Sequence, residues 1–98
     1  MIYELRLQAV DDVEEVRVLA WHRAEGDPVE SGEMIVEVET SKAIIELRSA
    51  NRCFLRKISV DRGDWARVGA SLGVFSDTRD EELLTDGARD LAATFEVT

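Results

Sequence analysis

The feature that most constrains the fold of this chain is an internal duplication at an offset of 37 residues. The dipeptide Gly26-Asp27 recurs as Gly63-Asp64, and Gly32 recurs as Gly69. Positions between these turns correspond as well: Val18 with Leu55, Trp21 with Ile58, Ile35 with Leu72, Val36 with Gly73 and Val38 with Phe75. Such a repeat predicts two similar halves that bury their apolar faces against one another about a pseudo-twofold axis.

Short runs in which apolar and polar residues alternate predict β-strands. These runs cover 2–7, 16–21, 34–48 as a hairpin, 54–60, 65–68 and 71–75. Gly-containing turns lie between many of them, and no stretch before residue 77 has a convincing helical pattern. The chain is therefore predicted to be all-β, a sandwich or a flattened barrel.

The hairpin at 34–48 places a lysine at its tip. Two runs rich in Val, Ile and Leu flank the polar pair Ser41-Lys42, which predicts a tight, exposed turn. At the offset of the duplication, residues 40–43 correspond to 77–80, where the second half ends. We therefore expect Lys42 to lie far from both ends of the chain.

Lysine is scarce in this chain, which has ten arginines but only Lys42 and Lys57. A site that needed only positive charge would more often hold arginine, whereas a primary amine can also be acylated to a neutral amide. Lys42 is thus a candidate for covalent attachment of a cofactor. The hairpin alone also fits a plainer interpretation, in which Lys42 is a solvated turn residue or prevents edge-to-edge strand pairing.

Composition excludes several classes of function. The chain has 98 residues, enough for one small domain, and a net charge of −9, which argues against nucleic acid or an anionic membrane as a partner. No apolar run approaches a membrane span, so we expect a cytoplasmic protein. His22 and Cys53 are the only residues of their kinds, so neither a metal cluster nor a catalytic triad is expected, and the protein is not predicted to be an enzyme.

Residues 77–98 differ in character from the rest, with seven acidic residues against two arginines. We expect 1–76 to form the folded domain, and 77–98 to be a flexible acidic tail or the beginning of a linker. The domain itself gives little reason to expect a dimer. Both tryptophans, Trp21 and Trp65, are expected to pack in the core or on a sheet face.

A family resemblance rests on the residues that surround these turns. They are Trp21, Glu25 to Val29, Gly32, Val38 to Ala43 with Lys42 among them, Glu46, Val60, Gly63-Asp64 and Val68-Gly69. Together they resemble the lipoyl domain of the 2-oxo acid dehydrogenase acyltransferases, over about 16–75. The resemblance implies a flattened barrel of two four-stranded antiparallel sheets.

The resemblance also implies a function, that of a carrier module without catalytic residues of its own, which can belong to an acyltransferase component. Lys42 would bear lipoate in amide linkage, and Glu39, Thr40, Ser41 and Ala43 would flank it as recognition residues. The implied partners are a lipoate-attaching enzyme, a thiamine-dependent decarboxylase, an acyltransferase and a flavin-dependent dihydrolipoamide dehydrogenase. Acyl groups and reducing equivalents would pass between these enzymes on the lysine-linked arm.

Two alternatives remain. A biotin carboxyl carrier domain has the same fold, but that family resembles Met-Lys-Met at the attachment site, where Ser41 and Ala43 stand here. The other alternative is an interaction domain of the same fold that is not modified. It is motivated by Ser41, where the family commonly has Asp, and by Val16 and Cys53, where it has glycine in each half.

Overall fold

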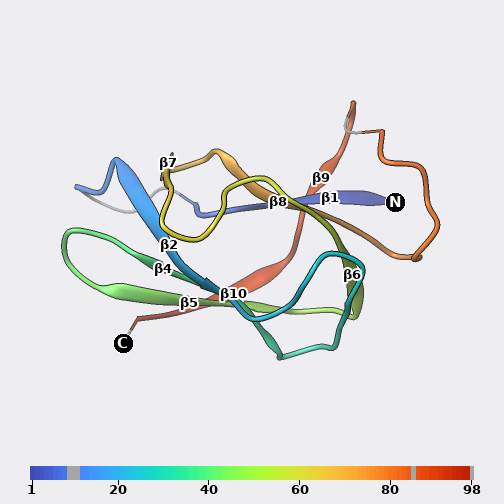
Figure 1. Ribbon diagram of the computed structural model, residues 1–98, viewed down its shortest axis with the longest axis horizontal. Helices are drawn as coiled ribbons and strands as arrows, with labels where there is room; N and C mark the ends of the chain where they lie inside the picture. Colours follow the sequence, from blue (N-terminus) through green and yellow to red (C-terminus); the bar gives the residue numbers. More distant parts are fainter. Residues whose placement is uncertain (9–11, 85, 98) are drawn as a thin grey trace.

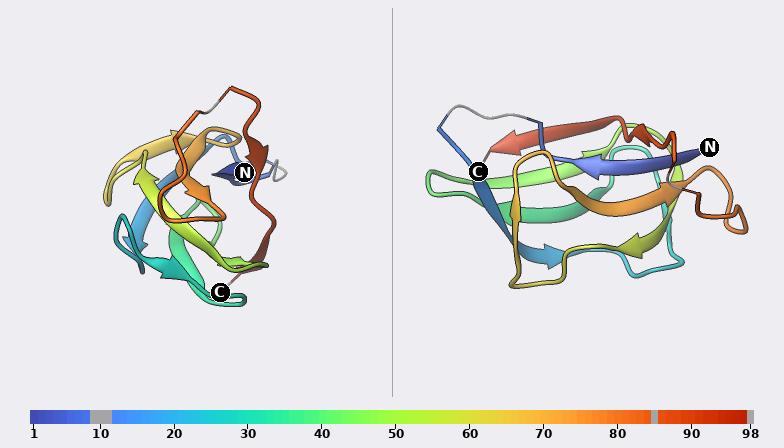
Figure 2. Two further views of the ribbon diagram at one scale, coloured as in Figure 1. Left: turned by 90° about the vertical axis from the view of Figure 1, so that its right-hand side faces the viewer. Right: turned by 90° about the horizontal axis from the view of Figure 1, so that it is seen from above.

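The computed structural model describes residues 1–8, 12–84 and 86–97, which form a flattened sandwich of two five-stranded sheets (Figures 1 and 2). In the first sheet the order is β3-β6-β8-β1-β9, and in the second it is β10-β5-β4-β2-β7. The strands are β1 (Ile2–Arg6), β2 (Glu15–Trp21), β3 (Pro28–Val29), β4 (Met34–Glu39), β5 (Ile44–Ser49), β6 (Cys53–Ile58), β7 (Trp65–Arg67), β8 (Ser71–Ser76), β9 (Arg89–Asp90) and β10 (Ala93–Val97). None of the described residues forms a helix that could cross a membrane. The predicted all-β fold class is confirmed.

The predicted duplication is visible in the pairing of the strands. Written from opposite edges, the two sheets have equivalent orders, with β3, β6, β8 and β1 matching β7, β2, β4 and β5. The register of β2 on β4 shifts at Leu19, and that of β6 on β8 shifts at Arg56, 37 residues later. The register also shifts at Ile35 in β4 and at its counterpart Leu72 in β8. The two halves therefore share irregularities as well as strands, as a pseudo-twofold axis requires.

The repeated Gly-Asp turns fasten each half to the other. Gly26 and Gly63 have φ values of 94° and 88°, a left-handed conformation that other residues rarely adopt. The amide of Gly26 donates to the carbonyl of Leu55, and that of Gly63 to the carbonyl of Val18, both over 2.7 Å. Because Val18 and Leu55 are themselves equivalent, these hydrogen bonds are reciprocal across the sandwich.

The core lies between the sheets and includes both positions at which the family resemblance leads one to expect glycine. Val16 is fully buried and Cys53 is 1% exposed, and both belong to one apolar cluster with Phe75 and Leu47. Burial also raises the pKa of the Cys53 thiol, although its hydrogen bond with Ser49 opposes this. The two side chains thus fill equivalent interior positions of the two halves.

The expectation of a flexible tail over 77–98 is corrected by the structure, apart from 85 and 98, which lie outside the described residues. Residues Ala93–Val97 pair antiparallel with β5, and Arg89–Asp90 pair with β1 in parallel, so each sheet gains a fifth strand. The buried side chain of Leu91 anchors the segment between them, and its amide donates to the carbonyl of Glu4 over 2.9 Å. Edge strands are held largely by backbone hydrogen bonds, so the acidic composition did not prevent pairing.

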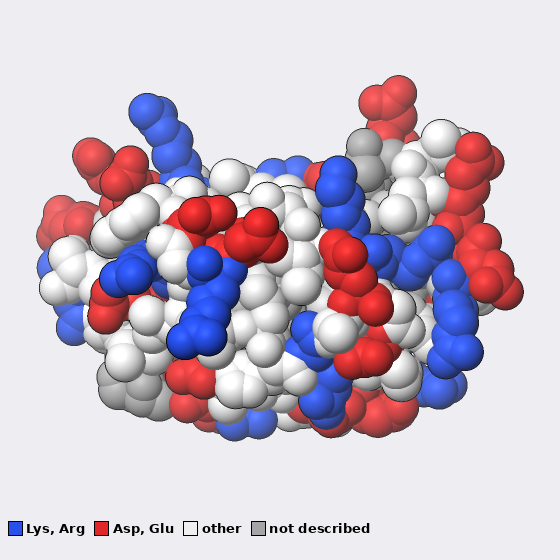
Figure 3. Space-filling model, viewed as in Figure 1, with Lys and Arg blue, Asp and Glu red and all other residues white. Residues whose placement is uncertain are grey.

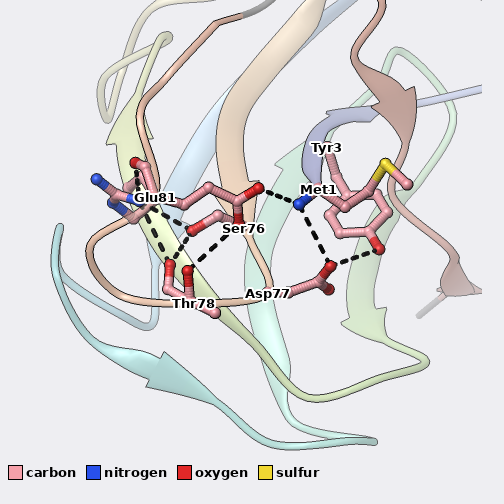
Figure 4. Close-up of polar contacts among 7 residues, drawn as sticks. Met1, Tyr3, Ser76, Asp77, Thr78 and Glu81 are labelled. Atoms are coloured by element: carbon pink, nitrogen blue, oxygen red, sulfur yellow. Dashed lines mark hydrogen bonds and ion pairs between the residues drawn. The ribbon is translucent and has the colours of Figure 1, made fainter.

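The segment that follows β8 is fastened to the beginning of the chain (Figure 4). The amine of Met1 forms ion pairs with Glu81 and, over 3.6 Å, with Asp77. Arg56 donates from β6 to the carbonyl of Glu81 over 2.7 Å. This network lies at the end of the molecule opposite the β4–β5 hairpin (Figure 1).

Candidate cofactor-attachment site

The turn between β4 and β5 is closed by one backbone hydrogen bond and by the hydroxyl of Thr40. The amide of Thr40 donates to the carbonyl of Ala43 over 2.8 Å. Its Oγ1 accepts from the amides of Lys42 and Ala43, over 3.1 and 3.0 Å, and is 3.1 Å from the carbonyl of Ala43, to which it can donate. Because Thr40 is only 8% exposed, the turn is held from within the end of the sheet, and the two outer residues, Ser41 and Lys42, are exposed.

The conformation of this turn removes one reason to expect aspartate before the lysine. Among the described residues, Asp12 is the only one other than glycine with a positive φ, at 62°. Ser41 and Lys42 therefore lie in ordinary regions of backbone space, where serine is under no strain. Ser41 is exposed and adds no charge of its own beside the lysine.

Lys42 presents its amine to solvent at the tip of the hairpin. The side chain is 58% exposed, and its Nζ lies 3.4 Å from Oδ2 of Asp12, a carboxylate that is itself 83% exposed. A salt bridge between two such exposed groups adds little stability and does not hold the amine in place. The other lysine, Lys57, is also exposed but lies within β6 rather than at a turn. Only Lys42 thus combines an accessible amine with a protruding position.

The flanking residues predicted from the sequence all come together at this end of the hairpin. Glu39 ends β4, is half-buried and is paired with Ile44 across the hairpin. Ala43 is half-buried and carries only a methyl group next to the lysine. Thr40, expected to take part in recognition, has a structural task that sequence patterns did not indicate, since it builds the turn.

The expectation that Lys42 lies far from both chain ends is correct for the amino terminus and wrong for the carboxyl end. Val97, the last residue of β10, pairs with Ile45, three positions from Lys42. Figures 1 and 2 show the C-terminal strand returning along β5 to the hairpin end of the molecule. The repeat alone could not predict this return, because β10 lies outside the duplicated region.

A pocket of about 530 Å³ adjoins the turn and was not predicted. It is lined by four acidic side chains, Asp12, Glu14, Glu15 and Glu39, together with Thr40, Ser41 and Trp65. Pairing of β2 with β7 brings these segments together, since Glu15 lies opposite Arg67 and Arg17 opposite Trp65. The sequence shows the acidic run before β2 and Trp65 after the second Gly-Asp turn. It does not show the strand register that brings them together.

Trp65 departs from the expectation that it packs in the core or on a sheet face. It is 60% exposed, whereas Trp21 is half-buried and donates from Nε1 to the carbonyl of Val60 over 2.9 Å. The indole of Trp65 is thus a large apolar surface left open beside the lysine turn. On the face of the molecule that Figure 3 shows, acidic and basic side chains are interspersed.

The acidic residues of the pocket do not form a metal site. Within the described ranges, no group of three or more His, Cys, Asp or Glu side chains is arranged to hold a metal ion. Their effect is electrostatic, because several carboxylates around one hollow give it a negative potential. The ammonium of Lys42 offsets part of that potential at the rim, through Asp12.

Comparisons with known proteins agree with this geometry. Residues 8–75 match the family described as biotin-requiring enzyme, which joins biotin and lipoyl attachment domains. A dihydrolipoyllysine-residue acetyltransferase of the chloroplast pyruvate dehydrogenase complex of Arabidopsis thaliana is 33% identical over 67 residues, which are 68% of this chain and 14% of the relative. The dihydrolipoyllysine-residue succinyltransferase of the 2-oxoglutarate dehydrogenase complex of Bacillus subtilis is 31% identical over 70 residues, 71% of this chain and 17% of that protein.

A third relative extends the match further along the chain. The lipoamide acyltransferase of the mitochondrial branched-chain alpha-keto acid dehydrogenase complex of Arabidopsis thaliana is 34% identical over 83 residues. This alignment covers 83% of the present chain and 17% of the relative. The chain therefore spans less than a fifth of the length of these relatives.

Proposed function

The chain belongs to the biotin and lipoyl attachment family, and from this premise we propose that Lys42 carries lipoate in amide linkage and that the domain acts as a mobile acyl carrier. The observation that carries the proposal is the exposed amine of Lys42 at a turn built by Thr40. Acylation replaces the ammonium by a neutral amide, and the exposed pair with Asp12 offers little resistance to this change.

The residues around Lys42 fit a linear acyl group. Ser41 and Ala43 are both small, and no bulky side chain flanks the amine in the sequence. When bound, lipoate supplies a disulfide that can be reduced and acylated, which is chemistry that the protein side chains do not provide. The domain contributes the position of the amine, its exposure and a rigid sandwich behind it.

Lipoate is favoured over biotin for two reasons. The relatives above are named for dihydrolipoyllysine or lipoamide, and none of those three is named for biotin. The flanking residues Ser41 and Ala43 also differ from the two methionines expected beside a biotinyl lysine. Biotin attachment, with carboxyl transfer in place of acyl transfer, remains the rival outcome of the test below.

The proposed partners follow from the carrier function. They are a lipoate-attaching enzyme, a thiamine-dependent decarboxylase that loads the arm, an acyltransferase that unloads it and a dihydrolipoamide dehydrogenase that reoxidises it. The three relatives are components of different 2-oxo acid dehydrogenase complexes, so the partners are proposed by class. Tethering an acyl group to a small domain raises its effective concentration at each partner's active site.

The second candidate is an unmodified interaction domain. The strand β10 favours it, because it pairs with β5 as far as Ile45 and covers an edge of the hairpin close to Lys42. The serine before the lysine no longer favours it, because the turn does not require a positive φ at Ser41.

Intact-mass spectrometry of the protein from its own cells, grown with ample lipoate, separates these outcomes. Peptide mapping should place a lipoyl group on Lys42, and the Lys42→Arg variant should lose it while Lys57→Arg keeps it. A biotinyl group on Lys42 would replace lipoate in the proposal. A bare Lys42 under these conditions would overturn the carrier function in favour of the interaction domain.

A further inference from the structure

The exposed indole of Trp65 lies in the same pocket as the base of the lysine turn. Thr40, Ser41 and Trp65 all line this pocket. An aromatic ring that is 60% exposed in a small charged domain is an apolar surface without a partner inside the described fold. The pocket volume of about 530 Å³ lies in the range of small-molecule sites.

The amine of Lys42 lies at the rim of this pocket. Its Nζ is 3.4 Å from Oδ2 of Asp12, which is one of the lining residues. A group joined to Nζ is therefore tethered beside a residue that lines the same pocket as the indole. Because such a group is tethered, its effective concentration at the pocket is high even if its intrinsic affinity is weak.

We propose that this pocket is the resting site of the lipoyl group on Lys42, with its ring sulfurs and methylene chain against the indole of Trp65. The inference rests on the proposed function and adds a non-covalent site to it. Sulfur and methylene groups both pack favourably on aromatic rings, and their burial removes apolar surface from water. The arm leaves the pocket whenever it enters a partner's active site.

The carboxylates around the pocket determine which loaded arms it can hold. Acylation of Lys42 removes the cation that pairs with Asp12, so Asp12, Glu14, Glu15 and Glu39 then act together. An arm that carries an uncharged acyl group is not repelled by these carboxylates. An arm that carries a carboxylate, such as a succinyl group, is repelled. The pocket therefore favours uncharged acyl groups.

Tryptophan fluorescence of the full chain tests the resting site, because a disulfide in contact with an indole quenches its emission. Lipoylated and bare protein are first distinguished by mass, so a missing adduct would count against the proposed function and not against the pocket. Lipoylation should therefore lower the emission of Trp65 in proportion to the docked fraction, about twofold for equal docked and free populations. The difference should vanish in Trp65→Phe, in which the half-buried Trp21 supplies the remaining signal.

The indole N–H resonances give a second readout that does not depend on quenching. Lipoylation should shift the signal of Trp65 and leave that of Trp21 unchanged. Loading the reduced arm with an acetyl group should preserve the shift, whereas a succinyl group should abolish it, and Glu14→Gln with Glu15→Gln should restore it. A verified lipoyl adduct that neither quenches nor shifts Trp65 would overturn the inference, as would equal retention of acetyl and succinyl arms.

Discussion

The turn after β4 and the segment after β8 occupy equivalent positions of the repeat but are held in opposite ways. Residues 40–43 form a self-contained turn, closed by the backbone of Thr40 and Ala43 and by the Thr40 hydroxyl. The first half thus needs no contact from a distant segment to shape its turn. Its lysine has one exposed ion pair, and the amine is available for chemistry.

Residues 77–80 have no hairpin partner and are held by distant groups instead. Tyr3 donates to Asp77 over 3.3 Å, the Met1 amine pairs with Asp77 over 3.6 Å, and Arg79 lies 5.3 Å from the centre of the Phe54 ring (Figure 4 shows the first two contacts). The position of Lys42 is thus occupied by a cation that packs against the protein. The comparison teaches that one copy of the turn presents a side chain, while the other fastens chain segments together.

Exchanging the two cations should have the largest effect on the difference between the two turns. Lys42→Arg keeps the positive charge but removes the amine, so we expect complete loss of the cofactor and of acyl transfer. Arg79→Lys places an amine at the equivalent position of the second half, and we expect it to remain unmodified because no hairpin tip presents it. Mass spectrometry of both variants measures the result; a modified Lys at 79 would show that the turn itself is not what is recognised.

Substitutions at the equivalent buried positions Val16 and Cys53 should have more similar effects on stability. Val16→Gly removes a fully buried side chain and loosens a strand, at an expected cost of about 2–4 kcal/mol in the free energy of unfolding. Cys53→Gly removes fewer atoms from the equivalent position, and we expect about 1–2 kcal/mol. Urea unfolding measures both. If neither variant lost stability, the two side chains could not be filling the interior between the sheets.

Which elements of the structure can be predicted from the sequence depends on the interactions that hold each of them. The repeat predicted the Gly26 and Gly63 turns, and the alternation of apolar and polar residues predicted the hairpin with Lys42 at its tip, because both depend on local backbone chemistry. The sequence did not predict β10, whose pairing with β5 uses backbone groups that every residue has. Nor did it predict the pocket, because Trp65 meets the acidic residues only through the register of β2 on β7.

A substitution of Thr40 tests whether the turn between β4 and β5 is self-contained. Thr40→Val keeps the shape of the side chain but leaves two amides without their acceptor, so we expect a loss of about 1–2 kcal/mol in unfolding free energy. We also expect slower attachment of lipoate, because Lys42 becomes less well positioned. Thr78→Val is the matched control, since the one hydrogen bond of its hydroxyl to the described residues is long, at 3.4 Å to Glu81. The rate of attachment is followed by mass for both variants. Equal effects of the two substitutions would contradict the contrast between the turns.

The stability that comes from the contacts of the segment after β8 should depend on pH. This effect should be smaller than those of the substitutions above. The hydrogen bond to the Met1 amine is the main cause of the lowered pKa of Glu81, and the same bond raises the pKa of the amine. The contribution of Glu81 is therefore present above its ordinary pKa of 4.5 and is lost as the pH falls through its lower folded value.

The contribution of the amine is fully present below its ordinary pKa of 8.0 and is lost as the pH rises through its raised folded value. Met1 is exposed and Glu81 is only half-buried, so solvent screens their interaction. The change in melting temperature should therefore be small and should shrink further with added salt. Acetylation of the amine should remove the alkaline part of the dependence and leave the β4–β5 turn and Lys42 unaffected, as amide exchange at the two sites can show. If acetylation instead altered exchange at residues 40–43, the two ends of the molecule would be coupled, and the independence on which the comparison rests would fail.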